Sequence, residues 1–202
     1  MIFSQCCIAE MDTNAIAIGD WSEVVHDKNH YALRGRLLIY GSESSGQLGG
    51  WNGDRVYLEL NHVNDGIEGW PIEIYTEDMD HWGALHFEMQ DAWGKLIPSE
   101  FGQDDHMVFP PPFNITLPND STLRLRVDSR GSLTFGAEAG TKKEVFRFIL
   151  NSGVWTVRPN STNDYFLSAT FTPPTNHIAS TNCHLWVGTL KLPKVKIPLP
   201  RN

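Results

Sequence analysis

Apolar and polar residues alternate with a period of two over most of this chain. The clearest segments are residues 56–61, 85–90, 123–128 and 165–171. Successive side chains of a β-strand point to opposite faces of the sheet, so each segment is expected to bury one face and expose the other. The pattern therefore predicts four amphipathic strands that share a hydrophobic core.

Shorter apolar alternations predict further strands. They lie at residues 34–40, 72–75, 132–135, 154–157 and 185–192, with a last alternation at positions 195 and 197. Turn-forming residues separate these segments, as in Asn64-Asp65-Gly66 and Pro173-Pro174. Many short strands punctuated by turns, without a regular alternation of strand and helix, predict an all-β antiparallel sandwich.

Three segments are compatible with more than one local structure. The apolar residues at 145, 146, 149 and 150 also match an amphipathic helix, so residues 142–150 are expected to form either a strand or one short crossing helix. Prolines at 193, 198 and 200 predict an edge strand or an extended tail, because proline has no N–H to donate. Residues 1–20 and 198–202 are expected to be extended or poorly ordered.

Five segments, taken in order, resemble the successive strands of bacterial immunoglobulin-like domains: VYLELNHVND, LHFEMQDAWGK, ITLPNDSTLRLRV, YFLSATFTPP and LWVGTLKLPKVKI. In such domains one strand carries an Asp-x-x-Gly-Lys turn and the closing strand contains Trp-x-Gly-Thr-Leu. The cysteine pair and the strand-C tryptophan of antibody domains have no counterpart, and residues 98–113 form a long insert. The resemblance implies an immunoglobulin-like sandwich, with at most one short helix, that serves as a binding or structural module.

Composition supports one folded domain over residues 1–202. Hydrophobic residues make up 41% of the chain, enough for a substantial core, and sandwiches of this length are common as single domains. The net charge is −8 and the 16 Lys and Arg residues are scattered, which argues against nucleic acid as a partner. No apolar run reaches the length that spans a bilayer, so no membrane insertion is expected.

The N-terminal segment and the cysteines bear on the compartment. Residues 1–20 lack a basic start and an unbroken apolar stretch, so no export signal is expected and a cytoplasmic location is favoured. The three cysteines, Cys6, Cys7 and Cys183, are an odd number without metal-ligand spacing. Reduced thiols are the first interpretation, and a bridge from Cys183 to Cys6 or Cys7 in an oxidising compartment is the alternative.

Four tryptophans lie beside Gly or Pro in predicted turns: Trp51, Trp70, Trp82 and Trp93. If their rings are exposed, they form a platform for sugars, because a flat indole takes the apolar face of a pyranose while polar neighbours take its hydroxyls. The competing interpretation, which we favour, is that these rings fold back to cap the ends of the core.

Acidic residues gather in two predicted loops that contain Asp78, Asp80 and Asp104, each with a histidine nearby. If the loops meet, their carboxylates would hold Ca²⁺, or the histidines with an aspartate would hold a transition metal. Acidic turns are usually solvated surface, so no cofactor is expected to be required.

No nucleophile elbow, phosphate loop or zinc-protease motif is present. Paired carboxylates such as Glu88 with Asp91, or Glu59 with Glu73, would suit glycoside hydrolysis only if they faced each other. Arg124 alternates with core residues and is expected to form a surface ladder with Arg126, and an anion site only if an acidic group docks there.

These observations lead to three hypotheses. The first is a non-enzymatic binding module whose partner is another protein or a second copy, contacted through loops around residues 70–82 and 103–113. The alternative is a carbohydrate-binding module that uses the turn tryptophans, with or without Ca²⁺. An enzyme on a sandwich scaffold ranks third, because no motif supports it.

Overall fold

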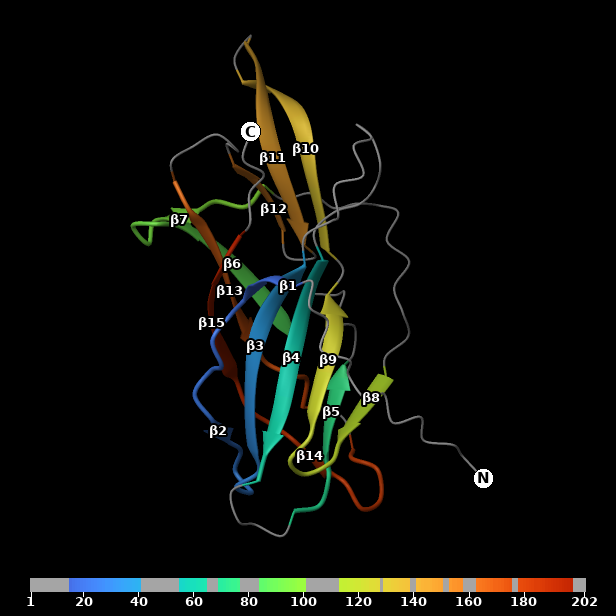
Figure 1. Cartoon of the computed structure of the whole chain (residues 1–202). Coiled ribbons are helices and arrows are strands. Elements are labelled where there is room, and N and C mark those ends of the chain that lie inside the picture. The colour runs from blue at the N-terminus through green and yellow to red at the C-terminus, as the bar shows by residue number, and fades with distance from the viewer. Residues whose placement is uncertain are drawn as a thin grey trace.

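The computed structural model describes residues 15–40, 55–64, 69–76, 84–100, 113–127, 129–138, 141–150, 153–157, 163–175 and 178–197. Every regular element in these ranges is a β-strand, and the strands form four sheets (Figure 1). No helix long and apolar enough to cross a membrane occurs in this described part. The all-β fold class expected from the alternating pattern is therefore confirmed.

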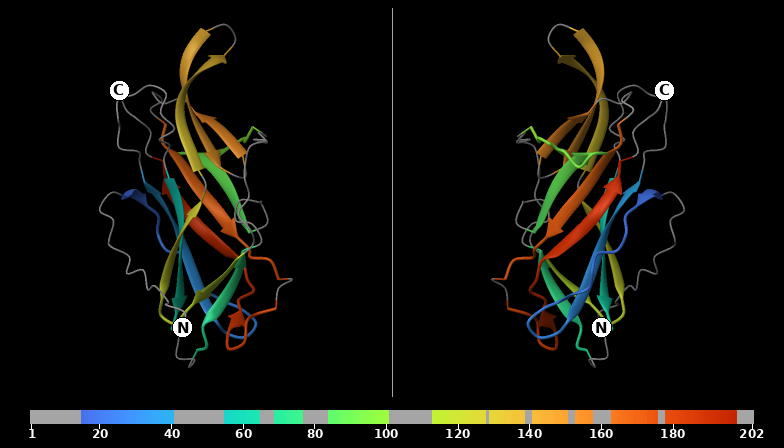
Figure 2. Two further views of the ribbon diagram at one scale, coloured as in Figure 1. Left: turned by 90° about the vertical axis from the view of Figure 1, so that its right-hand side faces the viewer. Right: turned by 90° about the vertical axis from the view of Figure 1, so that its left-hand side faces the viewer.

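Two sheets form the layers of the sandwich. One has the order β1-β3-β4-β9, with β2 also paired to β3: β1 (Ala15–Ile18), β2 (Val25–His26), β3 (Ala32–Tyr40), β4 (Arg55–Val63) and β9 (Thr122–Val127). The other has the order β15-β13-β6-β7: β15 (Leu190–Lys196), β13 (Tyr165–Phe171), β6 (Leu85–Asp91) and β7 (Leu96–Ile97). Neighbouring strands in both are antiparallel, and the strands of the two layers run obliquely to one another (Figure 2).

Two smaller sheets extend the layers. At one end β5 (Ile72–Thr76) pairs with β8 (Phe113–Leu117) antiparallel and with the short β14 (His184–Leu185) in parallel. At the other end β10 (Ser129–Glu138), β11 (Thr141–Leu150) and β12 (Gly153–Val157) form an antiparallel sheet. The β10–β11 hairpin extends past the other strands (Figure 1).

One hydrophobic core receives side chains from all four sheets. Every second residue of β6 and of β13 is buried, and Met89 and Leu167 are completely so. From the facing layer, Leu37 and Leu58 are completely buried as well. Removing such a side chain from water contributes about 1.5–3 kcal/mol to the stability of the fold. The apolar residues of the period-two pattern therefore supply the principal stabilisation of the fold.

Glycine allows the two layers to approach closely at one point. A Cβ at Gly35 on β3 would lie 2.8 Å from the Leu192 Cδ2 atom on β15 and 3.2 Å from the Leu60 Cδ2 atom. Ordinary carbon contacts are about 3.5–4.0 Å, so a side chain at Gly35 would force its neighbours apart.

The helix allowed by the apolar spacing at residues 142–150 is not formed, and these residues belong to β11. β11 is bonded on one side to β10 and on the other to β12, which satisfies its backbone groups without a helix. Phe148 and Leu150 are buried while Arg147 beside them is exposed, so the period of two prevails over the helical spacing.

The single strand expected at residues 185–192 is interrupted. β14 ends at Leu185 and β15 begins at Leu190, and between them the fully buried ring of Trp186 lies against Gly188. Among the described strands β15 pairs with β13 alone, so of the two alternatives expected from the prolines, the edge strand is the one found around Pro193, while Pro198 and Pro200 lie outside the described residues. Pro193 lies where the register shifts, at a position where its missing N–H interrupts no ladder.

Candidate functional site

The turn between β6 and β7 is fixed by its own residues. Asp91 Oδ1 accepts hydrogen bonds from the backbone N–H groups of Trp93 (3.0 Å) and Lys95 (2.9 Å). The Gly94 N–H donates to the Asp91 carbonyl, and Gly94 has a φ of 80°, which favours glycine. The Asp-x-x-Gly-Lys sequence thus encodes a closed, locally determined turn.

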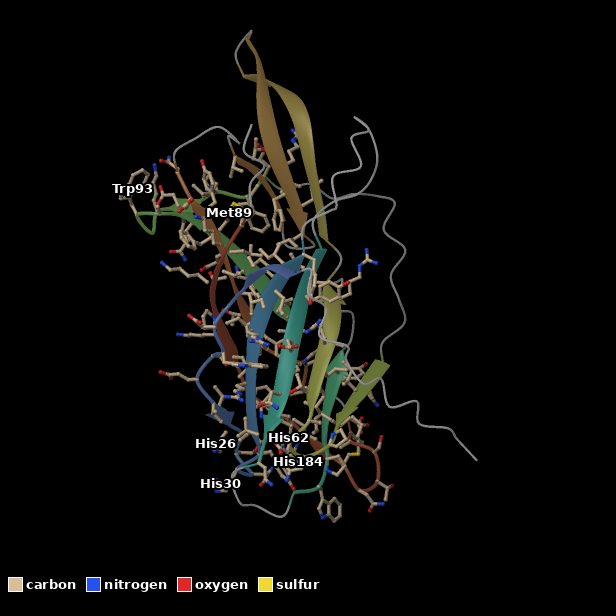
Figure 3. All side chains as sticks on the ribbon, in the orientation of Figure 1. His26, His30, His62, Met89, Trp93 and His184 are labelled. Carbon is tan, nitrogen blue, oxygen red and sulfur yellow. The ribbon has the colours of Figure 1, made fainter. Side chains whose placement is uncertain are left out.

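This turn displays a large aromatic ring. Trp93 is 75% exposed, and Figure 3 shows it at the tip of the hairpin, pointing away from the sheets. Leu96 on β7 is 57% exposed, while Met89 on β6 is directed into the core. A rigid hairpin with one buried side and an exposed Trp–Leu pair is a candidate contact surface.

The other turn tryptophan described is also exposed but lies elsewhere. Trp70, just before β5, is 55% exposed, and the carbonyl of the adjacent Pro71 accepts the N–H of His184. In Figure 3, His184 lies near the lower end of the molecule and Trp93 lies on the left of its upper half, far from it. The structure therefore does not join Trp70 and Trp93 into one platform. Both rings face solvent rather than capping the core, and Trp51 and Trp82 lie outside the described residues.

A buried aspartate organises the end of the sandwich where His184 lies. The side chain of Asp27 is 0% exposed. Its Oδ1 atom accepts the N–H groups of Asn29 (2.8 Å) and Tyr31 (3.0 Å), and its Oδ2 atom lies 2.9 Å from His184 Nε2. The Tyr31 ring stacks on the His184 ring at 4.3 Å. These contacts join the turn before β3 to β14, 157 residues further along the chain.

Four histidines gather at this same end, as Figure 3 shows for His26, His30, His62 and His184. His62 is 2% exposed, and its Nδ1 atom is 3.2 Å from each of the Leu117 and Pro118 carbonyl oxygens. Carbonyl oxygens only accept, so Nδ1 carries the proton. Within the described ranges, no three His, Cys, Asp or Glu side chains are placed to hold a metal ion.

The residues expected to bind Ca²⁺, Asp78, Asp80 and Asp104, lie outside the described part of the chain. Cys6 and Cys7 do too, and Cys183 carries a free, half-buried thiol. The distance between the two acidic loops, and with it the expected Ca²⁺ site, therefore stays a prediction.

Three of the carboxylates considered for acid–base chemistry have structural partners. Glu59 forms ion pairs with Arg36 and Arg124, and Asp91 closes the hairpin turn. Glu73 is fully buried, and its Oε2 atom accepts the N–H of Ser180 (2.9 Å). Each of these three carboxylates therefore has a structural role in the fold.

Comparison with protein-family models, with curated proteins and with solved structures finds no match to this chain.

Proposed function

We propose that this protein is a non-enzymatic binding module on an immunoglobulin-like sandwich, and that it contacts a protein partner through the Trp93 hairpin. The observation that supports the proposal is the exposed indole on a turn that Asp91 holds in place. Tryptophan is enriched among the residues that dominate protein interfaces. Because the backbone of the turn is already fixed, it loses little conformational entropy on binding.

The exposed ring is large enough to matter energetically. A tryptophan side chain buries about 150–250 Å² when covered, and Trp93 has 75% of its surface still available. At about 25 cal/mol per Å², covering it contributes about 3–5 kcal/mol. Replacing Trp93 with serine is therefore expected to weaken binding by at least about a hundredfold.

The test compares Trp93→Ser with a matched control, Ile178→Ser, which removes an exposed apolar side chain elsewhere (88% exposed). Each variant and the wild type are analysed by sedimentation velocity for self-association and by affinity purification from the native cells for other partners. We expect the wild type and Ile178→Ser to form a complex and Trp93→Ser to form none. Equal complex formation by both variants would contradict it.

The polar surroundings of the same turn favour one second candidate, a carbohydrate-binding module. A Cβ at Gly94 would lie 3.7 Å from Gln90 Oε1, so an amide oxygen lies beside the turn that carries the indole, and Lys95 is exposed next to it. A titration with soluble oligosaccharides, followed by tryptophan fluorescence, tests this candidate. Quenching that Trp93→Ser abolishes would favour the carbohydrate function over the protein-binding one. Repeating it with Ca²⁺ and with EDTA tests the calcium site expected at Asp78, Asp80 and Asp104.

A further inference from the structure

The outer face of the β3-β4-β9 sheet carries a row of arginines. Arg34 and Arg36 alternate with core residues on β3, so both project from the outer face about 7 Å apart along the strand. In register, Arg36 lies opposite Glu59 on β4, which lies opposite Arg124 on β9. Arg34 lies opposite the neutral Asn61.

The ring of Trp21 lies against the side chains of two of these arginines, Arg34 and Arg36. Trp21 belongs to the segment that runs beside β3, fixed by the bonds from Gly19 N–H to the Leu37 carbonyl and from Ser22 N–H to the Gly35 carbonyl. The Cζ atoms of Arg34 and Arg36 lie 4.8 Å and 4.3 Å from the centre of the Trp21 ring.

Stacking of this kind restrains a guanidinium group while leaving its N–H edge available for hydrogen bonds. Arg34 Nε donates to Asn61 Oδ1 (2.9 Å), and Arg36 Nε donates to Glu59 Oε2 (2.5 Å). The Nη1 and Nη2 atoms of both arginines have no acceptor among the residues that the structure describes. Two restrained guanidinium groups therefore present their terminal donors on the same face.

The charges on this face do not balance. Glu59, whose side chain is 7% exposed, is shared between Arg36 and Arg124, while the hydrogen bond of Arg34 goes to a neutral amide. Counted over the residues that the structure describes, these three arginines and one glutamate leave two positive charges uncompensated on half-buried side chains, which is costly because burial weakens the screening of like charges.

The acids nearest to Trp21 in the sequence do not remove this imbalance. Asp20 and Glu23 are exposed, and in the described part of the chain neither forms an ion pair with Arg34 or Arg36. The chain as a whole has a net charge of −8, so this cluster of arginines is opposite in sign to the net charge of the chain.

We propose that Arg34 and Arg36 bind a dianionic phosphoryl group beside Trp21. Its two negative charges match the two uncompensated guanidinium charges, and its tetrahedral oxygens accept hydrogen bonds from both arginines, whereas a carboxylate supplies one charge and a planar pair of acceptors. The site lies on a sheet face and is independent of the Trp93 hairpin, so either proposal stands or fails alone.

The experiment is a ³¹P NMR titration of the intact protein with inorganic phosphate, and in a second arm with phosphoserine, at constant ionic strength. Binding is expected to broaden and shift the phosphorus resonance, and Arg34→Gln is expected to weaken it about tenfold or more. The matched control is Arg126→Gln on β9, an exposed arginine of the same sheet, which is expected to change the affinity by no more than about twofold. Arg34→Lys keeps the charge without the planar fork and should fall between Arg34→Gln and the wild type.

The two arms separate the sources of the phosphoryl group. Tighter binding of phosphoserine assigns the site to phosphate esters, and tighter binding of inorganic phosphate assigns it to the free ion. The proposal is overturned if neither binds, if Arg34→Gln binds as well as the wild type, or if acetate competes as effectively as phosphate. Because the resonance reports binding to folded protein, a loss of stability is recognised separately by a thermal melt of each variant.

Discussion

Replacing Gly35 with alanine tests how closely the two sheets pack. The new Cβ would lie 2.8 Å from Leu192 Cδ2, so that methyl group must retreat by about 1 Å to reach an ordinary contact distance. Overpacking a core in this way costs about 1–3 kcal/mol. Alanine also restricts the unfolded chain, which returns about 0.4–1 kcal/mol. The expected net loss in the free energy of unfolding is about 1–2 kcal/mol.

A second substitution should relieve the clash. Leu192 is 3% exposed, so Leu192→Ala alone is expected to cost about 2–5 kcal/mol through the cavity that it leaves. In the double variant the methyl group introduced at position 35 enters the space vacated by Cδ2. The loss in the free energy of unfolding of the double variant should therefore be about 1–2 kcal/mol smaller than the sum of the losses of the two single variants.

Urea unfolding followed by tryptophan fluorescence measures each variant of this cycle. The control cycle pairs Gly35→Ala with Val157→Ala on β12, which lies in another sheet, and is expected to be additive within about 0.5 kcal/mol. A neutral Gly35→Ala combined with an additive Gly35–Leu192 cycle would refute the close approach of β3 and β15.

Three further outcomes are expected from unfolding experiments. Asp27→Ala should lower the free energy of unfolding by about 3 kcal/mol, because it removes the acceptor of three hydrogen bonds. Gly188→Ala should lower the Tm by about 4–8 °C, because a Cβ there would lie 2.6 Å from two atoms of the buried Trp186 ring. Glu59→Gln should lower the free energy of unfolding, measured by urea titration, by about 2–3 kcal/mol, because it leaves two arginines without their shared counter-charge.

An exposed acid on β6, Glu88, supplies a control for the charge changes. Glu88→Ala should stay within about 0.5 kcal/mol of the wild type. An Asp27→Ala or Glu59→Gln variant as stable as Glu88→Ala would show that the corresponding network contributes little. An unchanged Tm for Gly188→Ala would mean that Trp186 does not pack as described.

The sequence predicts most of the strands because strand formation leaves a period-two signature that packing then reinforces. Residues 165–171 form β13 with the expected bounds, and the Asp91 turn follows from side-chain chemistry confined to five residues. The apolar spacing at residues 142–150 is compatible with a helix. It contains no information on the two neighbouring strands, β10 and β12, whose pairing with this segment makes it a strand.

Contacts between distant segments leave no comparable signature. Asp27 and His184 lie in irregular or very short segments, and no spacing rule relates two residues so far apart. The position of Trp21 cannot be predicted from alternation either, because it lies between β1 and β2 and belongs to no strand. The spacing of Arg34 and Arg36, at positions i and i+2 of a strand, does predict that they share a face, but not that Trp21 lies against them. The sequence does not determine the exposure of Trp93 either, because the same Asp-x-x-Gly-Lys turn is compatible with an indole that folds inward or outward.

The most direct test of the binding role is photo-cross-linking from the tip of the Trp93 hairpin. A benzophenone amino acid at Ala92, which is exposed and adjacent to Trp93, leaves the indole and Leu96 intact, and the same probe at the exposed Lys191 on β15 serves as the control. We expect a discrete protein adduct from position 92 that Trp93→Ser abolishes, and none from position 191. No adduct from position 92, or one that persists in Trp93→Ser, would contradict the assignment of this hairpin as the contact surface.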